Sequence, residues 1–306
     1  MSKLNASYDE IVDVSRIGEH QKVDFNQNLL SLALKENITS NKKDSVRRLL
    51  LCIDVQKDFV EGGSLAVPGS IGDIERITRF IYNNMSGITD IMCSMDTHYP
   101  FHIFFSPWWC DADGNNPAPY TMINYEDVEK GKWRPVIGNP QKSLTYLQKL
   151  EEQAKKTLCI WPYHCIRGTE GYDLENEFAK MVYYHSTARK TIPRIIQKGM
   201  DFYSEMYGII KPEFSDKNIK NTDVLNAFEN YDEIYVVGEA ASHCLMESVK
   251  QIAEEYATRP EITSKITVLE DCTSSITGFE EVTRDAFDMF KRTYGIKFAK
   301  STEIQF

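Results

Sequence analysis

Three residues of different chemistry follow three short apolar runs of this chain. Asp54 and Lys198 each close such a run, and Cys244 follows a third run by a short turn. If the runs are parallel strands of one sheet, their carboxyl ends meet at one edge, where open α/β sheets place their ligand crevices. An acid, an amine and a thiol at that edge form a nucleophile with its base and an electrostatic partner. The residue types therefore predict nucleophilic catalysis by Cys244.

Cys244 is expected to open the helix that follows the turn. Unpaired amides and the helix dipole stabilise a thiolate at such a position and lower the thiol pKa, and the same amides could hold an oxyanion. The alternative is a buried structural cysteine, which is the usual fate of a lone cysteine. Asp54 ends a very apolar run, where a carboxylate is costly unless it is paired, and Lys198 is its natural partner. A structural ion pair would explain these two residues alone, but the three residues together favour catalysis.

A second group of residues has the spacing of metal ligands. Asp96 and His98 frame one residue at the end of another apolar run, His102 follows four residues later, and His164 lies further along the chain. An Asp-x-His pair in extended chain lets two side chains reach one ion, and a third ligand from a neighbouring strand end leaves positions open for water or substrate. Each histidine alone is more often a core or surface residue, so the spacing by itself supports a metal site only weakly.

The elements that position these residues alternate between strands and helices. Strands are predicted near 48–55, 90–95, 157–161, 194–198, 233–238 and 265–269, and helices near 26–35, 73–86, 141–155, 173–186, 221–230, 243–256 and 280–293. Short apolar runs separated by helices are typical of right-handed βαβ units. The sequence therefore predicts an α/β fold whose mostly parallel sheet, of about six strands, is covered by helices on both faces. In the helix after Cys244, apolar side chains form a stripe at positions 245, 249, 252, 253 and 256.

Two regions fall outside this alternation. Residues 1–46 are polar and weakly patterned, and we interpret them as an N-terminal extension that packs on the main domain of residues 47–306. An insertion at about 106–157 begins with a stretch rich in proline and glycine, and long loops of this kind tend to be lids or binding loops. Its three tryptophans either form a satellite core or line the pocket. The pocket interpretation applies best to Trp161, which follows the insertion.

The composition excludes some classes of function and indicates a cellular compartment. The 306 residues carry a net charge of −10 without a block of Lys and Arg, which argues against nonspecific binding to nucleic acid or to anionic membranes. The sequence shows no signal peptide and no run near the roughly 18 apolar residues of a membrane span. Seven cysteines without paired spacings fit reduced thiols, and we expect a soluble cytoplasmic protein.

Taken together and in order, the motifs resemble those of nicotinamidases, which are isochorismatase-like cysteine hydrolases. The motifs are IDVQKDF at 53–59, GGSLAVPG at 62–69, DTH at 96–98, HI at 102–103, WPYHC at 161–165, GT at 168–169, KG at 198–199 and GEAASHC at 238–244. The resemblance spans roughly residues 48–275 in segments. Each motif alone is unspecific, but the combination is highly specific.

The resemblance implies a three-layer α/β fold and a catalytic triad. The triad would consist of Asp54, Lys198 and Cys244. The backbone amides of Ala240 and Cys244 would form the oxyanion hole. A cis peptide bond would fall at Glu239–Ala240.

The resemblance also implies a divalent metal ion and an aromatic pocket. The metal ion would be zinc, with iron and manganese as alternatives, and its ligands would be Asp96, His98 and His164. His102 matches a position that is a further ligand in some members of the family. Phe59 and Trp161 match aromatic residues that sandwich a pyridine ring.

The function implied by the resemblance is hydrolysis of a small carboxamide to the acid and ammonia through a thioester, in pyridine nucleotide salvage. A homo-oligomer is expected on the resemblance alone. The nearest alternative is an isochorismatase-type hydrolase of another small substrate, against which the predicted metal ligands argue. A ligand-binding member without catalysis is a further alternative, which the intact triad disfavours. The extension, the long insertion and the segment after Lys198, which brings Glu205 near the pocket, depart from compact nicotinamidases and leave the substrate open.

Overall fold

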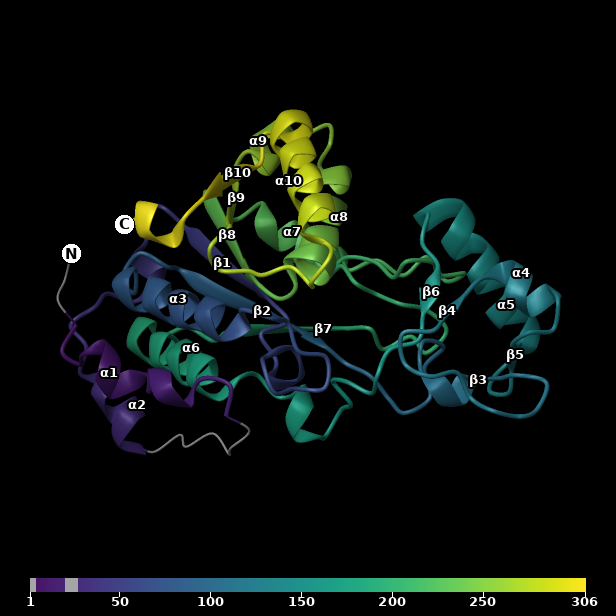
Figure 1. Ribbon diagram of the computed structural model, residues 1–306. Coiled ribbons are helices and arrows are strands. Elements are labelled where there is room, and N and C mark those ends of the chain that lie inside the picture. The colour runs from purple at the N-terminus through teal and green to yellow at the C-terminus, as the bar shows by residue number, and fades with distance from the viewer. Residues whose placement is uncertain (1–3, 20–26) are drawn as a thin grey trace.

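The centre of the protein is a six-stranded sheet in which every strand is parallel to its neighbours (Figure 1). The computed structural model describes residues 4–19 and 27–306. In spatial order the strands are β10 (Lys297–Ala299), β9 (Ile266–Leu269), β8 (Glu233–Gly238), β1 (Arg48–Ile53), β2 (Asp90–Asp96) and β7 (Arg194–Lys198). The winding reverses beside β1, because β2 and β7 extend the sheet to one side and β8, β9 and β10 extend it to the other. Open α/β sheets bind ligands at the carboxyl ends of the strands at such a reversal.

Helices cover both faces of the sheet, so the predicted three-layer fold is confirmed (Figure 1). One face carries α1 (Tyr8–Ile11), α2 (Gln27–Leu34), α3 (Ser70–Asn83) and α6 (Asn176–Arg189). The opposite face carries α7 (Thr222–Phe228), α8 (Met246–Glu255), α9 (Pro260–Thr263) and α10 (Glu280–Tyr294). None of the described helices has the length and apolar character needed to cross a membrane.

β1 shows how this layering follows from the sequence. Its side chains alternate between the two cores, since successive residues of a strand point to opposite faces. Leu50 and Cys52 enter one core, whereas Leu49, Leu51 and Ile53 enter the other. A strand buried on both sides reads as an uninterrupted apolar run. The predicted stripe after Cys244 is likewise confirmed, because positions 245, 249, 252, 253 and 256 all lie in the second core.

Two strands differ from the prediction. The run at 157–161 does not join the main sheet, because β6 (Leu158–Cys159) pairs antiparallel with β4 (Met122–Ile123) in a separate two-stranded sheet. The sixth strand of the main sheet is β10, which the sequence pattern missed. This strand has three residues and no buried side chain, so it lacks the apolar run on which the prediction depends.

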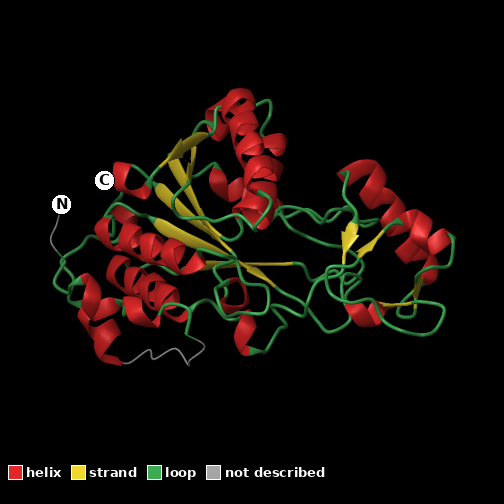
Figure 2. Cartoon of the chain, in the orientation of Figure 1, coloured by secondary structure: helices red, strands yellow, loops and turns green. Residues whose placement is uncertain are grey.

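The insertion has a hydrophobic core of its own and projects beyond the sheet (Figure 2). Its further short elements are β3 (Trp109–Cys110), α4 (Tyr125–Glu129), β5 (Arg134–Pro135) and α5 (Pro140–Lys149). Trp108 and Trp109 are buried in this core and Trp133 packs against it, which confirms the satellite-core interpretation for these tryptophans.

The described part of the N-terminal segment packs on the first helical layer. α1 and α2 contribute side chains to the same core as α3 and α6. The buried Glu36 carboxylate accepts hydrogen bonds from the backbone amides of Asn5 and Ala6 and from the Tyr184 hydroxyl. The helix predicted over 26–35 is observed as α2, and residue 26 lies outside the described residues. The division into an extension and a main domain stays a prediction.

Gly238, the last residue of β8, is paired with Ile53, the last residue of β1. It has a φ of 112°, and a Cβ atom there would collide with the backbone of Ile53. A side chain is therefore excluded at the point where both strands deliver their functional residues.

We expect Gly238→Ala to destabilise the protein far more than Gly278→Ala. Gly278 also has a positive φ, of 89°, but nothing lies within 4 Å of its added Cβ, so its replacement costs only the backbone strain of about 1 kcal/mol. The collision at Gly238 adds about 2 kcal/mol or more. Denaturant unfolding of the two variants measures the difference, and equal midpoints would contradict the close approach of β1 and β8.

Candidate active site

The carboxyl ends of β1, β7 and β8 bring the three predicted catalytic residues together. Asp54 directly follows β1, Lys198 is the last residue of β7, and Cys244 lies in the turn after β8. Lys198 Nζ lies 2.9 Å from Asp54 Oδ2 and 3.6 Å from Cys244 Sγ. All three side chains are buried. The strand ends therefore assemble a carboxylate, an ammonium group and a thiol in one contact group.

Asp54 is held in an unusual backbone conformation by a serine on the neighbouring strand. Its φ is 46°, in the left-handed region that few residues other than glycine adopt. The Asp54 amide donates to Ser94 Oγ at 3.0 Å, and Ser94 Oγ in turn donates to Asp54 Oδ1 at 2.6 Å. Such conformations persist where the surrounding structure fixes them, and they cluster at active sites. Sequence reasoning missed Ser94, although a fully buried serine inside an apolar strand is a signal that could have identified it.

A buried ammonium group lies between two carboxylates. Besides Asp54, Lys198 Nζ contacts Asp96 Oδ1 at 3.0 Å, and it donates to the Met206 carbonyl oxygen at 3.1 Å. Burial alone would lower the pKa of Lys198, but Asp54 and Asp96 raise this pKa well above its ordinary value. Burial raises the pKa of Asp54, and the Lys198 ammonium group opposes that shift. Lys198 therefore stays charged and favours the ionised form of Asp54.

The predicted low thiol pKa of Cys244 is wrong. Cys244 lies inside the helical turn Ala241–Leu245, ahead of α8, and only 7% of it is exposed. Burial raises the pKa of the thiol well above its ordinary value, Lys198 lowers it, and Asp54, which forms a side-chain hydrogen bond with the thiol, raises it. The resting thiol therefore keeps its proton, and a base must remove it before the sulfur can attack. Asp54 is placed to do so.

Asp96, the last residue of β2, connects the triad to the predicted metal ligands. Gln56 holds its backbone, because the Asp96 amide donates to Gln56 Oε1 at 2.7 Å and Gln56 Nε2 donates to the Asp96 carbonyl at 2.9 Å. Gly199, with a φ of 77°, leaves room for its carboxylate, since a Cβ there would lie 2.7 Å from Asp96 Oδ1. One carboxylate oxygen thus faces Lys198 and the other faces the histidines.

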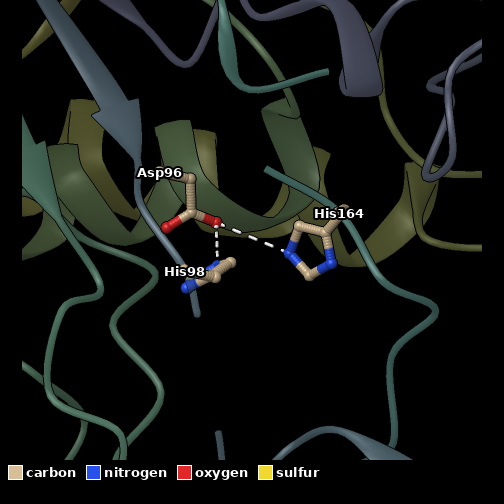
Figure 3. Close-up of side chains that lie close together, drawn as sticks. All are labelled: Asp96, His98 and His164. Carbon is tan, nitrogen blue, oxygen red and sulfur yellow. Dashed lines mark hydrogen bonds and ion pairs between the residues drawn. The ribbon is translucent and has the colours of Figure 1, made fainter. Parts of the chain in front are cut away.

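Asp96, His98 and His164 form a buried group whose ligand atoms all lie within 4.8 Å of one another (Figure 3). Asp96 Oδ2 lies 2.9 Å from His98 Nε2 and 3.6 Å from His164 Nε2. The structure therefore brings together the three side chains that the sequence pairs only through their spacing.

The donor set fits a divalent metal ion. His98 Nδ1 lies 3.2 Å from the Gly199 carbonyl oxygen, and His164 Nδ1 lies 2.8 Å from that of Pro162. A carbonyl oxygen can only accept, so each Nδ1 carries the hydrogen and each Nε2 faces the shared carboxylate. Metal-binding histidines almost always have such an outer hydrogen bond. Burial lowers the pKa of His98, which keeps the ring neutral and its Nε2 lone pair free for a metal ion.

His102 lies beside this group but is not one of its members. Its ring centroid is 5.1 Å from that of His98, and neither ring nitrogen has a hydrogen-bond partner among the described residues. Burial lowers the pKa of His102 to about 3, so the ring is neutral. Its role as a further ligand stays a prediction.

A pocket beside Cys244 contains both predicted aromatics and two of the predicted ligands. It is lined by Phe59, Leu65, Val67, Asp96, Trp161, His164, Glu205, Met206, Tyr207, Ala240, His243, Cys244 and Ile276. A molecule held in it can therefore contact the thiol and the Asp-His-His group at once. Sequence reasoning assigned no pocket role to Met206, Tyr207 or His243. His243 lies inside the motif at 238–244, but the other two lie outside every motif.

Glu205 is a polar residue in this otherwise largely apolar wall, near the pocket as predicted. Trp161 Nε1 donates to Glu205 Oε2 at 2.8 Å, and the Glu205 amide donates to the Tyr146 hydroxyl at 2.9 Å. Burial raises the pKa of Glu205 to about 7. The hydrogen bond also fixes the Trp161 ring in the pocket wall.

Comparisons with known proteins show which proteins the chain resembles. No family model matches the chain. The chain is 26% identical to the nicotinamidase of Saccharomyces cerevisiae over 242 residues, which cover 77% of this chain and 91% of that protein. It is 27% identical to the nicotinamidase/pyrazinamidase of Mycobacterium tuberculosis over 225 residues, which cover 72% and 84% of the two chains. Over most of its length the chain is thus similar to nicotinamidases, which are isochorismatase-like hydrolases.

Solved structures have the same fold as this nicotinamidase-like chain. Yeast nicotinamidase bound to the inhibitor nicotinaldehyde superposes with a TM-score of 0.57 and 21% identity, over 83% of this chain and 99% of that one. A nicotinamidase/pyrazinamidase of Acinetobacter baumanii gives a TM-score of 0.56 and 19% identity, over 85% and 99%. Because the curated relatives are nicotinamidases, we identify the chain as a nicotinamidase-like amidohydrolase.

We expect His98→Ala and His164→Ala to weaken binding of a divalent metal ion by about 10²-fold or more, since each removes a predicted direct ligand where loss of an outer partner already costs 10- to 100-fold. His185→Ala is the matched control, because His185 is also buried but bonds the Ile88 carbonyl oxygen at 3.0 Å in another part of the fold. Competition with a chromogenic chelator measures the affinity. Equal affinity in all four proteins would contradict the site.

We expect Lys198→Met to move the alkylation of Cys244 to higher pH. The variant loses the ammonium group that lowers the thiol pKa, so a smaller fraction of thiolate is present at each pH. Lys180→Met is the control, because Lys180 is a buried lysine that pairs with Glu177 at 2.8 Å in α6. Rates of iodoacetamide labelling at Cys244, followed by peptide mass spectrometry, should shift in the first variant only. An unchanged profile would contradict the contact between Lys198 and Cys244.

Proposed function

We propose that this protein hydrolyses a small aromatic carboxamide, of the nicotinamide type, to the acid and ammonia through a thioester on Cys244. The observation that carries the proposal is the placement of the buried Lys198 ammonium group between Asp54 and Cys244. Cys244 in turn lines a pocket together with Phe59 and Trp161. A thiol with its base and a fixed cation at the end of an apolar slot is an arrangement for acyl transfer.

In the first half of the reaction, Asp54 takes the thiol proton while Lys198 stabilises the charges on both partners. The thiolate attacks the carboxamide carbon, and the amides of Ala240 and Cys244 are the groups that we assign to the oxyanion. The tetrahedral intermediate then expels ammonia, which leaves with the proton that Asp54 returns. The acyl group remains on the sulfur as a thioester, so one C–N bond has been exchanged for one C–S bond.

In the second half, Asp54 accepts a proton from a water molecule that attacks the thioester carbon. The carbon–sulfur bond breaks, the carboxylic acid leaves, and the proton restores the Cys244 thiol. The same carboxylate thus serves as base in both halves, which requires its pKa to allow the proton to move in each direction. The opposed effects of burial and of Lys198 on Asp54 support such a role.

Asp96, His98 and His164 would hold the divalent metal ion, which we propose to be zinc, with iron or manganese as alternatives. When bound, the ion would supply an electrophilic contact for the substrate, for instance for a ring nitrogen. Phe59 and Trp161 would stack on the ring and exclude water. Because Asp96 also contacts Lys198, the residues that orient the substrate and those that attack it share one carboxylate.

The physiological setting follows from the same proposal. All seven cysteines are free thiols, as a reducing compartment requires, and we assign the activity to pyridine nucleotide salvage in the cytoplasm. A homo-oligomer remains an expectation from the family. The assembled Asp96, His98 and His164 group supports a nicotinamidase-type rather than an isochorismatase-type reaction.

Ammonia release from nicotinamide by the metal-replete protein tests the proposal. We expect turnover by the wild type and a loss of at least about 10³-fold in Cys244→Ala, since removal of one member of a catalytic unit abolishes its action. Cys159→Ala is the control, because Cys159 is a free thiol outside the pocket. Release of ammonia by Cys244→Ala at the wild-type rate would contradict the proposal.

A further inference from the structure

A buried pair of acidic residues adjoins the turn that bears Cys244. Glu239 follows β8 and precedes Ala240, and Asp73 lies in the first turn of α3. Glu239 is 0% exposed and Asp73 is 1% exposed. The mechanism above does not use either carboxyl group, and burial of two unneutralised carboxylates in contact would be very costly.

The charges around the pair do not neutralise both acids. Arg76, also on α3, donates to Asp73 Oδ1 at 2.7 Å and to the Asp271 carbonyl oxygen, so Asp73 has a cation of its own. The second oxygen of Asp73 and the two oxygens of Glu239 have no hydrogen-bond partner of normal geometry among the described residues. The other groups near Glu239 are the Ser274 amide and Arg76, which favour its ionised form, and Asp73, which favours the protonated form.

One proton resolves this conflict. A protonated Glu239 can donate a hydrogen bond to the Asp73 carboxylate. This side-chain hydrogen bond raises the pKa of Glu239. Burial and the neighbouring Asp73 charge raise the pKa of Glu239 well above its ordinary value. The nearby Cys272 thiol is also neutral, because burial raises its pKa. Arg76 and Asp73 then form one ion pair, and no second charge is buried.

Glu239 lies directly before the turn that carries the proposed oxyanion-hole amides. Its own amide donates to the Ile53 carbonyl oxygen at 2.8 Å, directly before Asp54, and the Ala241 amide donates to the Ser274 carbonyl oxygen at 2.8 Å. Between these two anchored amides lies Ala240, whose amide we assign to the oxyanion hole. The Glu239 side chain joins the same short segment to α3 through Asp73.

We propose that Glu239 is a positioning residue that, as a neutral acid hydrogen-bonded to Asp73, fixes the turn bearing the Ala240 and Cys244 amides. The inference rests on the proposed function for its catalytic consequence. The proton itself can be tested independently of turnover, because a carboxyl group that stays protonated only in the folded state makes folding stability depend on pH.

The sign of that dependence follows from the raised pKa. The unfolded chain releases the Glu239 proton near its ordinary pKa of about 4.3, whereas the folded protein retains it. The stabilising effect is therefore complete below that pH and is lost progressively as the pH rises toward the folded-state value. In Glu239→Gln the amide can donate to Asp73 as the neutral acid does, but it carries no titrating proton.

The experiment compares the wild type, Glu239→Gln, Glu239→Leu and Asp73→Asn, with Glu36→Gln as a control for a buried glutamate elsewhere. Melting temperatures are measured from about pH 5 to pH 8, the range above the ordinary pKa of glutamate. The wild type should lose stability relative to Glu239→Gln as the pH rises, and Asp73→Asn, which removes the facing charge, should show a weaker dependence. Parallel curves for the wild type and Glu239→Gln would overturn the shared proton, whether or not the protein hydrolyses carboxamides.

The positioning role is read from kcat and KM on a carboxamide that the wild type hydrolyses. Glu239→Gln should retain kcat within about threefold, and Glu239→Leu should lose about 10²-fold in kcat with little change in KM, as expected for misplaced transition-state donors. A merely structural role would lower the melting temperature of Glu239→Leu and leave kcat intact. A Glu239→Leu enzyme with the wild-type kcat would therefore overturn the inference, and if that variant does not fold, a large loss of kcat in folded Glu239→Gln would do so.

Discussion

The buried ammonium group of Lys198 is the interaction on which the rest of the site depends. It lies within 3.0 Å of carboxylate oxygens from two different strand ends and within 3.6 Å of the thiol on a third. Removing this cation would leave two carboxylates together in a buried region, which is far more costly than losing a surface ion pair. Attraction to this one cation thus ties together the functional side chains at the ends of β1, β2 and β7, whose backbones the sheet already pairs.

The same constraint couples the two parts of the site. Asp96 faces Lys198 with one oxygen and His98 and His164 with the other, so one side chain belongs both to the contacts of Lys198 and to the group that could hold a metal ion. Gly199 and Gly238 leave room for this arrangement because they lack a side chain. A Cβ at Gly199 would collide with Asp96, and a Cβ at Gly238 would collide with the end of β1. The insertion then adds an apolar lobe of its own beside the site, and Glu205, bonded to Trp161, lies in the pocket wall.

The main sheet and the position of the triad could be predicted from the sequence because both depend on local sequence patterns. Apolar runs buried on both faces, each ending in a reactive residue, indicate parallel strands and one shared edge, and this places Asp54, Lys198 and Cys244 together. Interactions that depend on tertiary contacts were not predictable. Ser94 and Asp73 carry no motif, β10 is too short for a pattern, and the run at 157–161 has a strand-like composition but pairs within the insertion. The thiol pKa was predicted in the wrong direction, because a helix start says nothing about how deeply the sulfur is buried.

A direct search for the acyl-enzyme tests whether Cys244 attacks the carboxamide carbon. The metal-replete protein would be mixed with nicotinamide, quenched in acid during the first turnovers and examined by intact-protein and peptide mass spectrometry, with hydroxylamine added in a parallel reaction. Attack by Cys244 predicts one nicotinoyl group on the peptide that contains Cys244 and diversion of part of the product to the hydroxamate. Steady release of ammonia with neither the adduct nor the hydroxamate would contradict it.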